Sequence, residues 1–198
     1  MEEEKEIRDF VKFLQLKVYK SILIPSFIIE TAFKKTIEDV QYHFKSKTKT
    51  EILKNICSNN NELAIFLFRL GNEIHLNNLE PLKFQIHWLL KEVCCCEIYF
   101  NNSIDVGFYV VHGEGLVIGS RNTIGKGFII HQGCTIGHKI NGSGKGNFIG
   151  DNVTLYCNSS IIGELNIGNN SIIGANVVVN KDVKENSKVI TSGKMILL

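Results

Sequence analysis

The sequence predicts an α+β fold in which a helical N-terminal domain is followed by a parallel β-helix of hexapeptide repeats. The first observation is a six-residue period in the C-terminal half, where an apolar residue recurs at Ile118, Ile124, Ile130, Ile136, Ile149, Leu155, Ile161, Ile167, Ile173 and Val179. This period matches neither an α-helix nor an alternating strand, but it is typical of a triangular β-coil. The second observation is the distribution of glycine, because residues 1–95 contain only Gly71 of the 17 glycines.

Residues 1–95 have the apolar spacing of amphipathic helices. One stripe recurs at intervals of three and four residues, at Ile7, Phe10, Val11, Leu14 and Val18. Further helices are predicted over residues 28–44, from Thr48 or Thr50 to about 57, over 62–74, and from Pro81 to about 93. We therefore expect about five helices that pack together as a domain over residues 1–95.

Residues 96–184 are expected to form the β-helix, and residues 185–198 a C-terminal tail. Three hexads make one coil, so about 14 hexads give between four and five coils, stacked at a strand spacing of about 4.8 Å. The repeated apolar side chains are expected to point into the prism, where they stack on those of neighbouring coils. Tight corners with positive φ are expected at Asn152, Asn170 and Asn176, each of which follows a glycine by two residues.

Two breaks interrupt the period. The first three hexads are two residues out of phase with the later run, and they are keyed on Ile98, Ile104 and Val110. This shift predicts a short insertion in residues 112–116. The step from Ile136 to Ile149 exceeds one hexad by seven residues. We therefore expect a glycine-rich loop over residues 138–148 that leaves the coil.

Composition excludes several classes of function. The net charge is +2, from 22 basic and 20 acidic residues, so no electrostatic attraction to nucleic acid or to a membrane is expected. The apolar segment 22–29 is broken by Pro25 and is too short to span a bilayer. Six cysteines, three of them adjacent at 94–96, lack the spacing of a metal site or of a disulfide framework. We expect reduced thiols in a cytoplasmic protein without a signal peptide or a metal.

Four motifs in order suggest a family. An acidic residue, Glu97, comes slightly less than one coil before His112-Gly-Glu-Gly-Leu-Val-Ile-Gly119, and Gln132-Gly-Cys-Thr-Ile-Gly137 follows. Two longer segments complete the series, over residues 149–168 and 173–183. From Glu97 to about Lys184, this series resembles the serine acetyltransferase branch of the hexapeptide-repeat acyltransferases.

The resemblance implies a left-handed β-helix that uses acetyl-coenzyme A as co-substrate and transfers the acetyl group to a hydroxyl. It also implies a homotrimer with active sites in the clefts between neighbouring prisms. A second contact through the helices, which would make a dimer of trimers, stays open.

The resemblance implies that His112 is the catalytic residue and that Glu97 is its acidic partner. A histidine can remove the proton of an attacking hydroxyl near neutral pH, and a carboxylate on the far ring nitrogen fixes its tautomer. Asp105, seven residues before His112, is the rival partner.

Further positions match the coenzyme site of the family, namely Gly137, His138, Lys145, Cys157 and Ala175. The position of Gly137 and His138 corresponds to a backbone N–H that faces the thioester oxygen. Lys145 lies in the predicted loop, where a cation could meet phosphate or the acceptor. Glu114 and His131 are candidates for contact with the acceptor.

Two departures from the family concern the acceptor. Serine acetyltransferases place an aspartate directly before the catalytic histidine and a histidine in the loop, where this chain has Val111 and Gly146. Both of these charged groups, which would bind the ammonium and carboxylate of an amino acid, are therefore missing. We expect a sugar or polysaccharide hydroxyl as the acceptor. Serine O-acetylation in cysteine biosynthesis is the alternative within enzymes, and a non-enzymatic trimeric scaffold is the alternative outside them.

Overall fold

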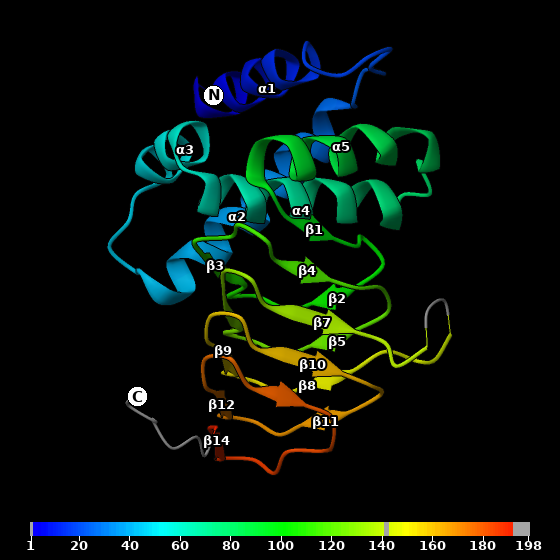
Figure 1. Ribbon diagram of the computed structural model, residues 1–198. Coiled ribbons are helices and arrows are strands. Elements are labelled where there is room, and N and C mark those ends of the chain that lie inside the picture. Colours follow the sequence, from blue (N-terminus) through cyan, green and yellow to red (C-terminus); the bar gives the residue numbers. More distant parts are fainter. Residues whose placement is uncertain (1, 141–142, 192–198) are drawn as a thin grey trace, which may run out of the picture.

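The computed structural model describes residues 2–140 and 143–191, and in this part of the chain helices precede strands (Figure 1). The helical elements are α1 (Glu2–Gln15), α2 (Ser26–His43), α3 (Lys49–Ser58), α4 (Asn60–Leu76), the 3-10 helix η1 (Glu80–Leu82) and α5 (Lys83–Cys94). They stack on one end of a column of strands. Of the two residues at which we expected this helix to begin, Thr48 caps α3: its side chain accepts from Glu51 N, while the Glu51 side chain accepts from Thr48 N.

The strands are short and parallel, and they form the three sides of a prism. They are β1 (Glu97–Ile98), β2 (Ser103–Ile104), β3 (Tyr109–Val111), β4 (Val117–Ile118), β5 (Thr123–Ile124), β6 (Ile129–His131), β7 (Thr135–Gly137), β8 (Phe148–Ile149), β9 (Thr154–Leu155), β10 (Ser160–Ile162), β11 (Asn166–Ile167), β12 (Ile172–Ile173), β13 (Val178–Val179) and β14 (Lys188–Val189). Every third strand joins the same sheet: sheet A is β1-β4-β7-β10-β13, sheet B is β2-β5-β8-β11 and sheet C is β3-β6-β9-β12-β14. The prediction of a helical domain followed by a parallel β-helix is confirmed.

The strand register confirms both breaks in the period. Ile98 pairs with Ile118, so this coil is two residues longer than three hexads. Ile124 pairs with Ile149, so the coil that contains the loop is seven residues longer than three hexads. The last coil is two residues shorter than three hexads, since Ile172 pairs with Lys188. The β-helix thus continues beyond residue 184, where we expected it to end. Residues 192–198 of the predicted tail lie outside the described part of the chain.

Stacked apolar residues fill the prism, and asparagines form its corners. The ten residues of the six-residue period are all buried. Asn152, Asn170 and Asn176 have positive φ, as predicted. A second ladder lies inside, where Asn102 Oδ1 accepts from Asn122 and Asn122 Oδ1 accepts from Asn147. Amides stacked at the coil spacing satisfy one another where no backbone partner is available.

Helix α4 is the centre of the helical domain. It is buried all round from Glu62 to Ile74, and it packs against α2, α3, α5 and strand β3. A helix that is apolar on most faces is stable only inside a core. The helical domain therefore shares one continuous core with the first coil, in which Phe68 packs edge-on against Phe108.

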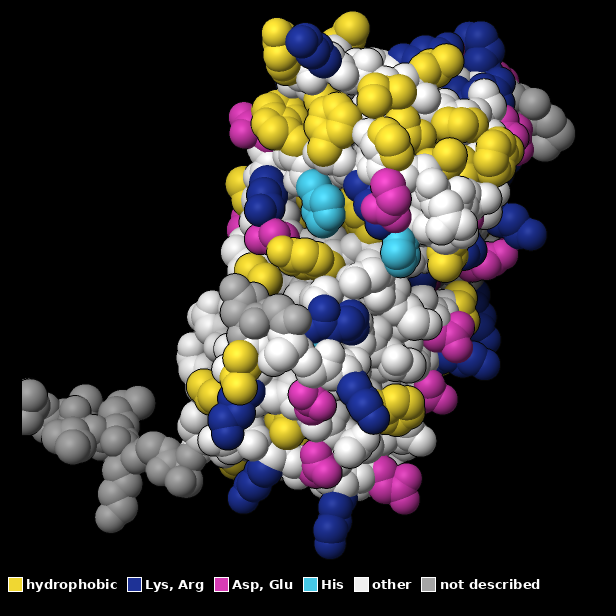
Figure 2. Space-filling model, turned by 90° about the vertical axis from the view of Figure 1, so that its right-hand side faces the viewer, with side chains coloured by type: hydrophobic (Ala, Val, Ile, Leu, Met, Phe, Trp, Pro, Cys, Tyr) yellow, Lys and Arg dark blue, Asp and Glu magenta, His cyan; other side chains and the backbone are white. Residues whose placement is uncertain are grey.

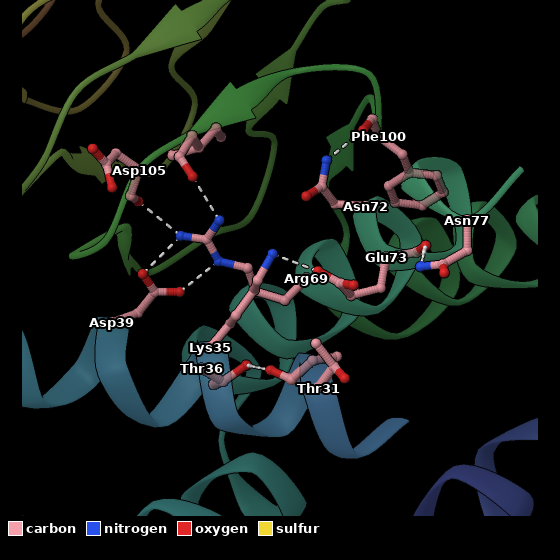
Figure 3. A network of polar contacts seen from close by, with 12 residues as sticks. Thr31, Lys35, Thr36, Asp39, Arg69, Asn72, Glu73, Asn77, Phe100 and Asp105 are labelled. Carbon is pink, nitrogen blue, oxygen red and sulfur yellow. Dashed lines mark hydrogen bonds and ion pairs between the residues drawn. The ribbon is translucent and has the colours of Figure 1, made fainter. Parts of the chain in front are cut away.

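Polar side chains of α2 and α4 cover the open edge of the first coil (Figure 3). Arg69 donates to the carbonyls of Ile104 at 2.6 Å and Asp105 at 2.8 Å, and it binds Asp39 through two bonds of 2.7 Å. Asp39 in turn accepts from the amides of Gly107 and Phe108. Burial raises the pKa of Asp39, and Arg69 together with the two amides offsets part of this rise.

Two further residues of α4, Asn72 and Gly71, belong to this cover over the edge of the first coil, which we call the cap. Asn72 Nδ2 donates to the Phe100 carbonyl at 2.8 Å and to the Asn102 carbonyl at 3.2 Å. Gly71 leaves room for the Phe100 ring, because a Cβ there would lie 2.2 Å from it. The helices thus supply the hydrogen bonds that a preceding coil would otherwise provide.

Arg69→Met is expected to lower the free energy of unfolding by about 3–5 kcal/mol, because it leaves the Asp39 carboxylate buried without its cation. Urea unfolding followed by circular dichroism measures this loss. Lys5→Met, which removes an exposed ion pair with Asp9, is the control and should leave the midpoint unchanged. An unchanged midpoint for Arg69→Met would show that the cap is not needed.

Candidate active site

The turns that border sheet A carry most of the predicted site residues. We name the turns from sheet C to sheet A the first corner; they span residues 112–116, 132–134, 156–159 and 174–177. The turns from sheet A to sheet B are the second corner; they span residues 99–102, 119–122, 138–147 and 163–165. Turns stack as regularly as strands do in this fold, so residues of one corner form a column.

His112 lies at the top of the first corner. It directly follows β3, has a φ of +54° and is exposed to solvent. The two-residue insertion after it makes a tight turn, in which Glu114 N donates to the His112 carbonyl and Gly115 N to the Cys95 carbonyl. The turn presents the His112 imidazole outward, where a reactant can reach it.

The expected hydrogen bond between Glu97 and His112 is not formed in the described part of the chain. Glu97 Oε1 instead lies 3.0 Å from Lys91 Nζ, at the end of α5. The rival carboxylate, Asp105, lies at a different corner, because it follows β2 in the turn between sheets B and C, where it accepts from Val106 N. The role of Glu97 as the partner of His112 stays a prediction.

His131 lies one coil below the start of the His112 turn. It pairs in register with Val111 and stacks on Tyr156 with ring centroids 4.9 Å apart. Burial lowers the pKa of His131, and the charge of the neighbouring His112 lowers it further. Cys157 and Ala175 continue the same column, and Glu114 belongs to its first turn. The first corner therefore carries four predicted residues, His112, Glu114, Cys157 and Ala175, and His131 directly precedes it at the end of β6.

Gln132 is a candidate that we did not predict. It follows His131, which places it in the coil directly below His112. Its Oε1 atom is buried and has no hydrogen-bond partner among residues 2–140 and 143–191. A buried amide oxygen without a donor is uncommon and is available to a ligand. Its place at the head of a family motif was the one signal in the sequence that could have indicated it.

His138 lies on the second corner, at the mouth of the predicted loop. Its Nε2 is 2.8 Å from the Ser120 carbonyl, so this nitrogen carries the proton. Its Nδ1 is buried and, within the described residues, accepts no hydrogen bond. A groove of about 540 Å³ runs along sheet A beside it, lined by Tyr99, Val117, Gly119, Ser120, Thr135, Ile136, Gly137, His138 and Lys139. Small residues in this wall leave space for a narrow ligand.

The excursion carries Lys145 on its second limb. Lys145 is exposed, and Arg121 binds the carbonyls of Ser143 and Gly144 beside it. Of the predicted loop, residues 141 and 142 lie outside the described part of the chain. His138 and Lys145 therefore lie in the second corner, and Gly137 directly precedes it at the end of β7. All three lie across sheet A from His112. One chain does not bring the two groups of predicted residues together.

Burial keeps the thiols of Cys94 and Cys96 protonated. Cys94, Cys96 and Cys134 are buried, and each of the six cysteines is a free thiol. Burial raises the pKa of Cys96 to about 12 and that of Cys94 further. A buried, protonated thiol is a poor nucleophile, so neither Cys94 nor Cys96 is a candidate for covalent catalysis.

Comparison with known proteins finds proteins that are similar to this chain. The family described as bacterial transferase hexapeptide (six repeats) matches residues 148–181. The serine acetyltransferase of Staphylococcus epidermidis is 39% identical over 128 residues, which cover 64% of this chain and 60% of that protein. The serine acetyltransferase of Helicobacter pylori is 28% identical over 130 residues, which cover 65% of this chain and 76% of that protein.

The resemblance to the serine acetyltransferase branch of the hexapeptide-repeat acyltransferases, predicted from the order of the motifs, is confirmed. Solved structures agree on the fold. The serine acetyltransferase of Brucella abortus superimposes with a TM-score of 0.75 at 20% identity, over 94% of this chain and 79% of that one. The enzyme of Neisseria gonorrhoeae gives 0.70 at 24% identity, over 82% and 62%.

The match does not extend over the whole length of these relatives. The chain spans 60% of the Staphylococcus epidermidis protein that it matches. In its described residues, no helix is long and apolar enough to cross a membrane. The same residues contain no group of three or more His, Cys, Asp or Glu side chains that could hold a metal ion.

The His112→Ala variant is expected to raise the pKa of His131, because it removes the positive charge that His112 contributes. The value should stay below the ordinary one near 6.5, since burial still disfavours the imidazolium. Titration of the His ring Cε1–H signals by NMR measures both midpoints. His87 is the control, because burial lowers its pKa and His112 is not among the charges that act on it, so its midpoint should be the same in both proteins. An unchanged His131 midpoint would contradict the proximity of the two rings.

Proposed function

We propose that this chain transfers the acetyl group of acetyl-coenzyme A to a hydroxyl, with His112 as the general base. The observation that supports this most is the 39% identity to a serine acetyltransferase across 64% of the chain. The hydroxyl oxygen attacks the thioester carbonyl carbon while His112 takes its proton. The C–S bond then breaks, and the coenzyme thiolate takes a proton from the imidazolium, which restores neutral His112.

Serine is the acceptor that the relatives favour, because the matched proteins are named serine acetyltransferases. A sugar hydroxyl is the second candidate, and a specific contact supports it. Gly146 has a φ of +88°, and a Cβ there would lie 2.0 Å from the Arg121 carbonyl oxygen. The loop histidine of the family therefore cannot replace Gly146 without a backbone shift. Val111 likewise offers no charge beside His112.

We further propose a homotrimer. The two groups of predicted residues lie on opposite edges of sheet A, so a complete site needs the first corner of one subunit and the second corner of another. Such a contact joins two different surfaces, which closes into a ring when the rotation permits. Acetyl-coenzyme A would then lie between subunits, with Lys145 and His138 on one side and His112 on the other.

A contact between two trimers is supported by the helical end. Hydrophobic side chains gather there on the face shown in Figure 2. Large apolar side chains of the helical domain are exposed, among them Leu16 at 83% and Tyr19 at 84%. Exposed apolar surface of this kind is typical of an interface. Light scattering would distinguish a trimer from a hexamer.

His112→Ala is expected to lower kcat by about 10²–10⁴-fold, because water replaces the positioned base. Thiol release from acetyl-coenzyme A measures the rate. Glu97→Gln should have a smaller effect, since its carboxylate acts through the imidazole. Coenzyme binding and the oligomeric state serve as controls and should not change. Full turnover by His112→Ala would refute the assignment.

Thiol release with serine, compared with a panel of sugars, identifies the acceptor. We expect turnover with serine if the specificity is that of the relatives. If the loss of the charged groups at positions 111 and 146 has changed the specificity, we expect turnover with a sugar and none with serine. Reaction without any acceptor is the background to subtract. No thiol release with any acceptor, together with no binding of coenzyme A, would favour the scaffold alternative.

A further inference from the structure

One arginine holds the second limb of the excursion, residues 143–147, against the β-helix. Arg121 Nε donates to the Gly144 carbonyl at 3.0 Å, and its Nη2 donates to the Ser143 carbonyl at 3.0 Å. The planar guanidinium spans two consecutive carbonyls, which a single ammonium group cannot do in the same geometry. Arg121 itself belongs to the turn between β4 and β5, where its φ is +63°. The support of the limb therefore comes from the preceding coil.

Backbone packing and a buried amide fix the other end of the limb. Gly146 passes against the Arg121 carbonyl, where a Cβ would meet the oxygen at 2.0 Å. The Asn147 backbone N donates to Asn122 Oδ1 at 2.9 Å, and its side chain donates to the same oxygen at 3.0 Å. Both asparagines are buried. Lys145 thus lies between two points that the β-helix holds in place.

Glycine gives the limb a shape that it could not keep without support. Gly144 and Gly146 have φ values of +89° and +88°, and a free glycine-rich segment samples many other conformations. The Glu164 side chain packs against Gly144, where a Cβ would meet its carboxylate. A ligand that binds to a limb already held in one conformation loses less affinity to ordering.

We propose that Arg121 is a positioning residue, which presets the limb so that Lys145 meets the phosphate-bearing part of coenzyme A. This inference rests on the proposed function, in which Lys145 binds that co-substrate. Arg121 acts through the backbone of Ser143 and Gly144 and not through the reacting atoms. Its loss therefore weakens coenzyme binding and leaves the acetyl transfer step intact.

Steady-state kinetics tests the effect on binding. Arg121→Ala is expected to raise the KM for acetyl-coenzyme A about tenfold, while kcat stays within about twofold of the wild-type value. Arg121→Lys keeps the charge but loses the planar guanidinium that binds two carbonyls at once, so its KM should stay at least about fivefold above the wild-type value. Lys126→Ala, at an exposed lysine in another turn, is the matched control and should behave as wild type. A wild-type KM in Arg121→Lys would overturn the proposal.

A double-mutant cycle tests whether Arg121 acts through Lys145. The double variant Arg121→Ala/Lys145→Ala should have the KM of Lys145→Ala alone, because the clamp has nothing left to position. Effects of the two single variants that multiply would show independent roles and would also overturn the proposal.

Hydrogen exchange tests the clamp without reference to turnover. Amides of residues 143–147 should exchange faster in Arg121→Ala than in Lys126→Ala, because the limb opens more often. Equal exchange in the two variants would refute the clamp even if the enzyme is active. Conversely, a wild-type protein that releases no thiol with any acceptor but shows the faster exchange would refute the proposed function and leave the clamp in place.

Discussion

The ion pair between Asp39 and Arg69 joins the helical domain to the β-helix, and the position of the candidate site depends on it. A β-helix satisfies its backbone by stacking each coil on the next, so its first coil has an exposed edge. Here Arg69 and Asp39 bind the carbonyls and amides of residues 104–108 directly, as a preceding coil would. Strand β3 follows this segment at once, and His112 follows β3. The cap thus fixes the backbone on which the candidate base stands.

The constant spacing of the coils explains why the candidate residues lie at corners. A residue inserted into a strand would break the register of every coil below, whereas an insertion in a turn leaves the ladders intact. Both insertions of this chain occur in turns, at 112–116 and at 138–147, on opposite edges of sheet A. One turns His112 outward, and the other projects Lys145. The regular fold is therefore the support, and its irregular turns carry the chemistry.

The contacts of the second corner bear on the acceptor as well as on the coenzyme. Because the limb lies flat against Arg121, Gly146 has no space for a side chain, and the place where relatives carry a histidine is closed. The similarity to serine acetyltransferases favours the proposal of serine, while this contact and Val111 favour an acceptor without charged groups. The unpartnered oxygen of Gln132, one coil below His112, is a neutral group that could bind either acceptor.

The sequence by itself determined the prism, both breaks in its period and the five helices, because a six-residue period and a three-to-four-residue spacing each have one common structural origin. It also indicated His112 and Lys145 through the order of the motifs. Only the tertiary structure showed that Lys91 holds Glu97, that Arg121 clamps the limb and that Gln132 Oε1 lacks a donor among the described residues. These facts depend on which side chains meet between coils and between helix and coil, and the spacing within one segment carries no information about such contacts.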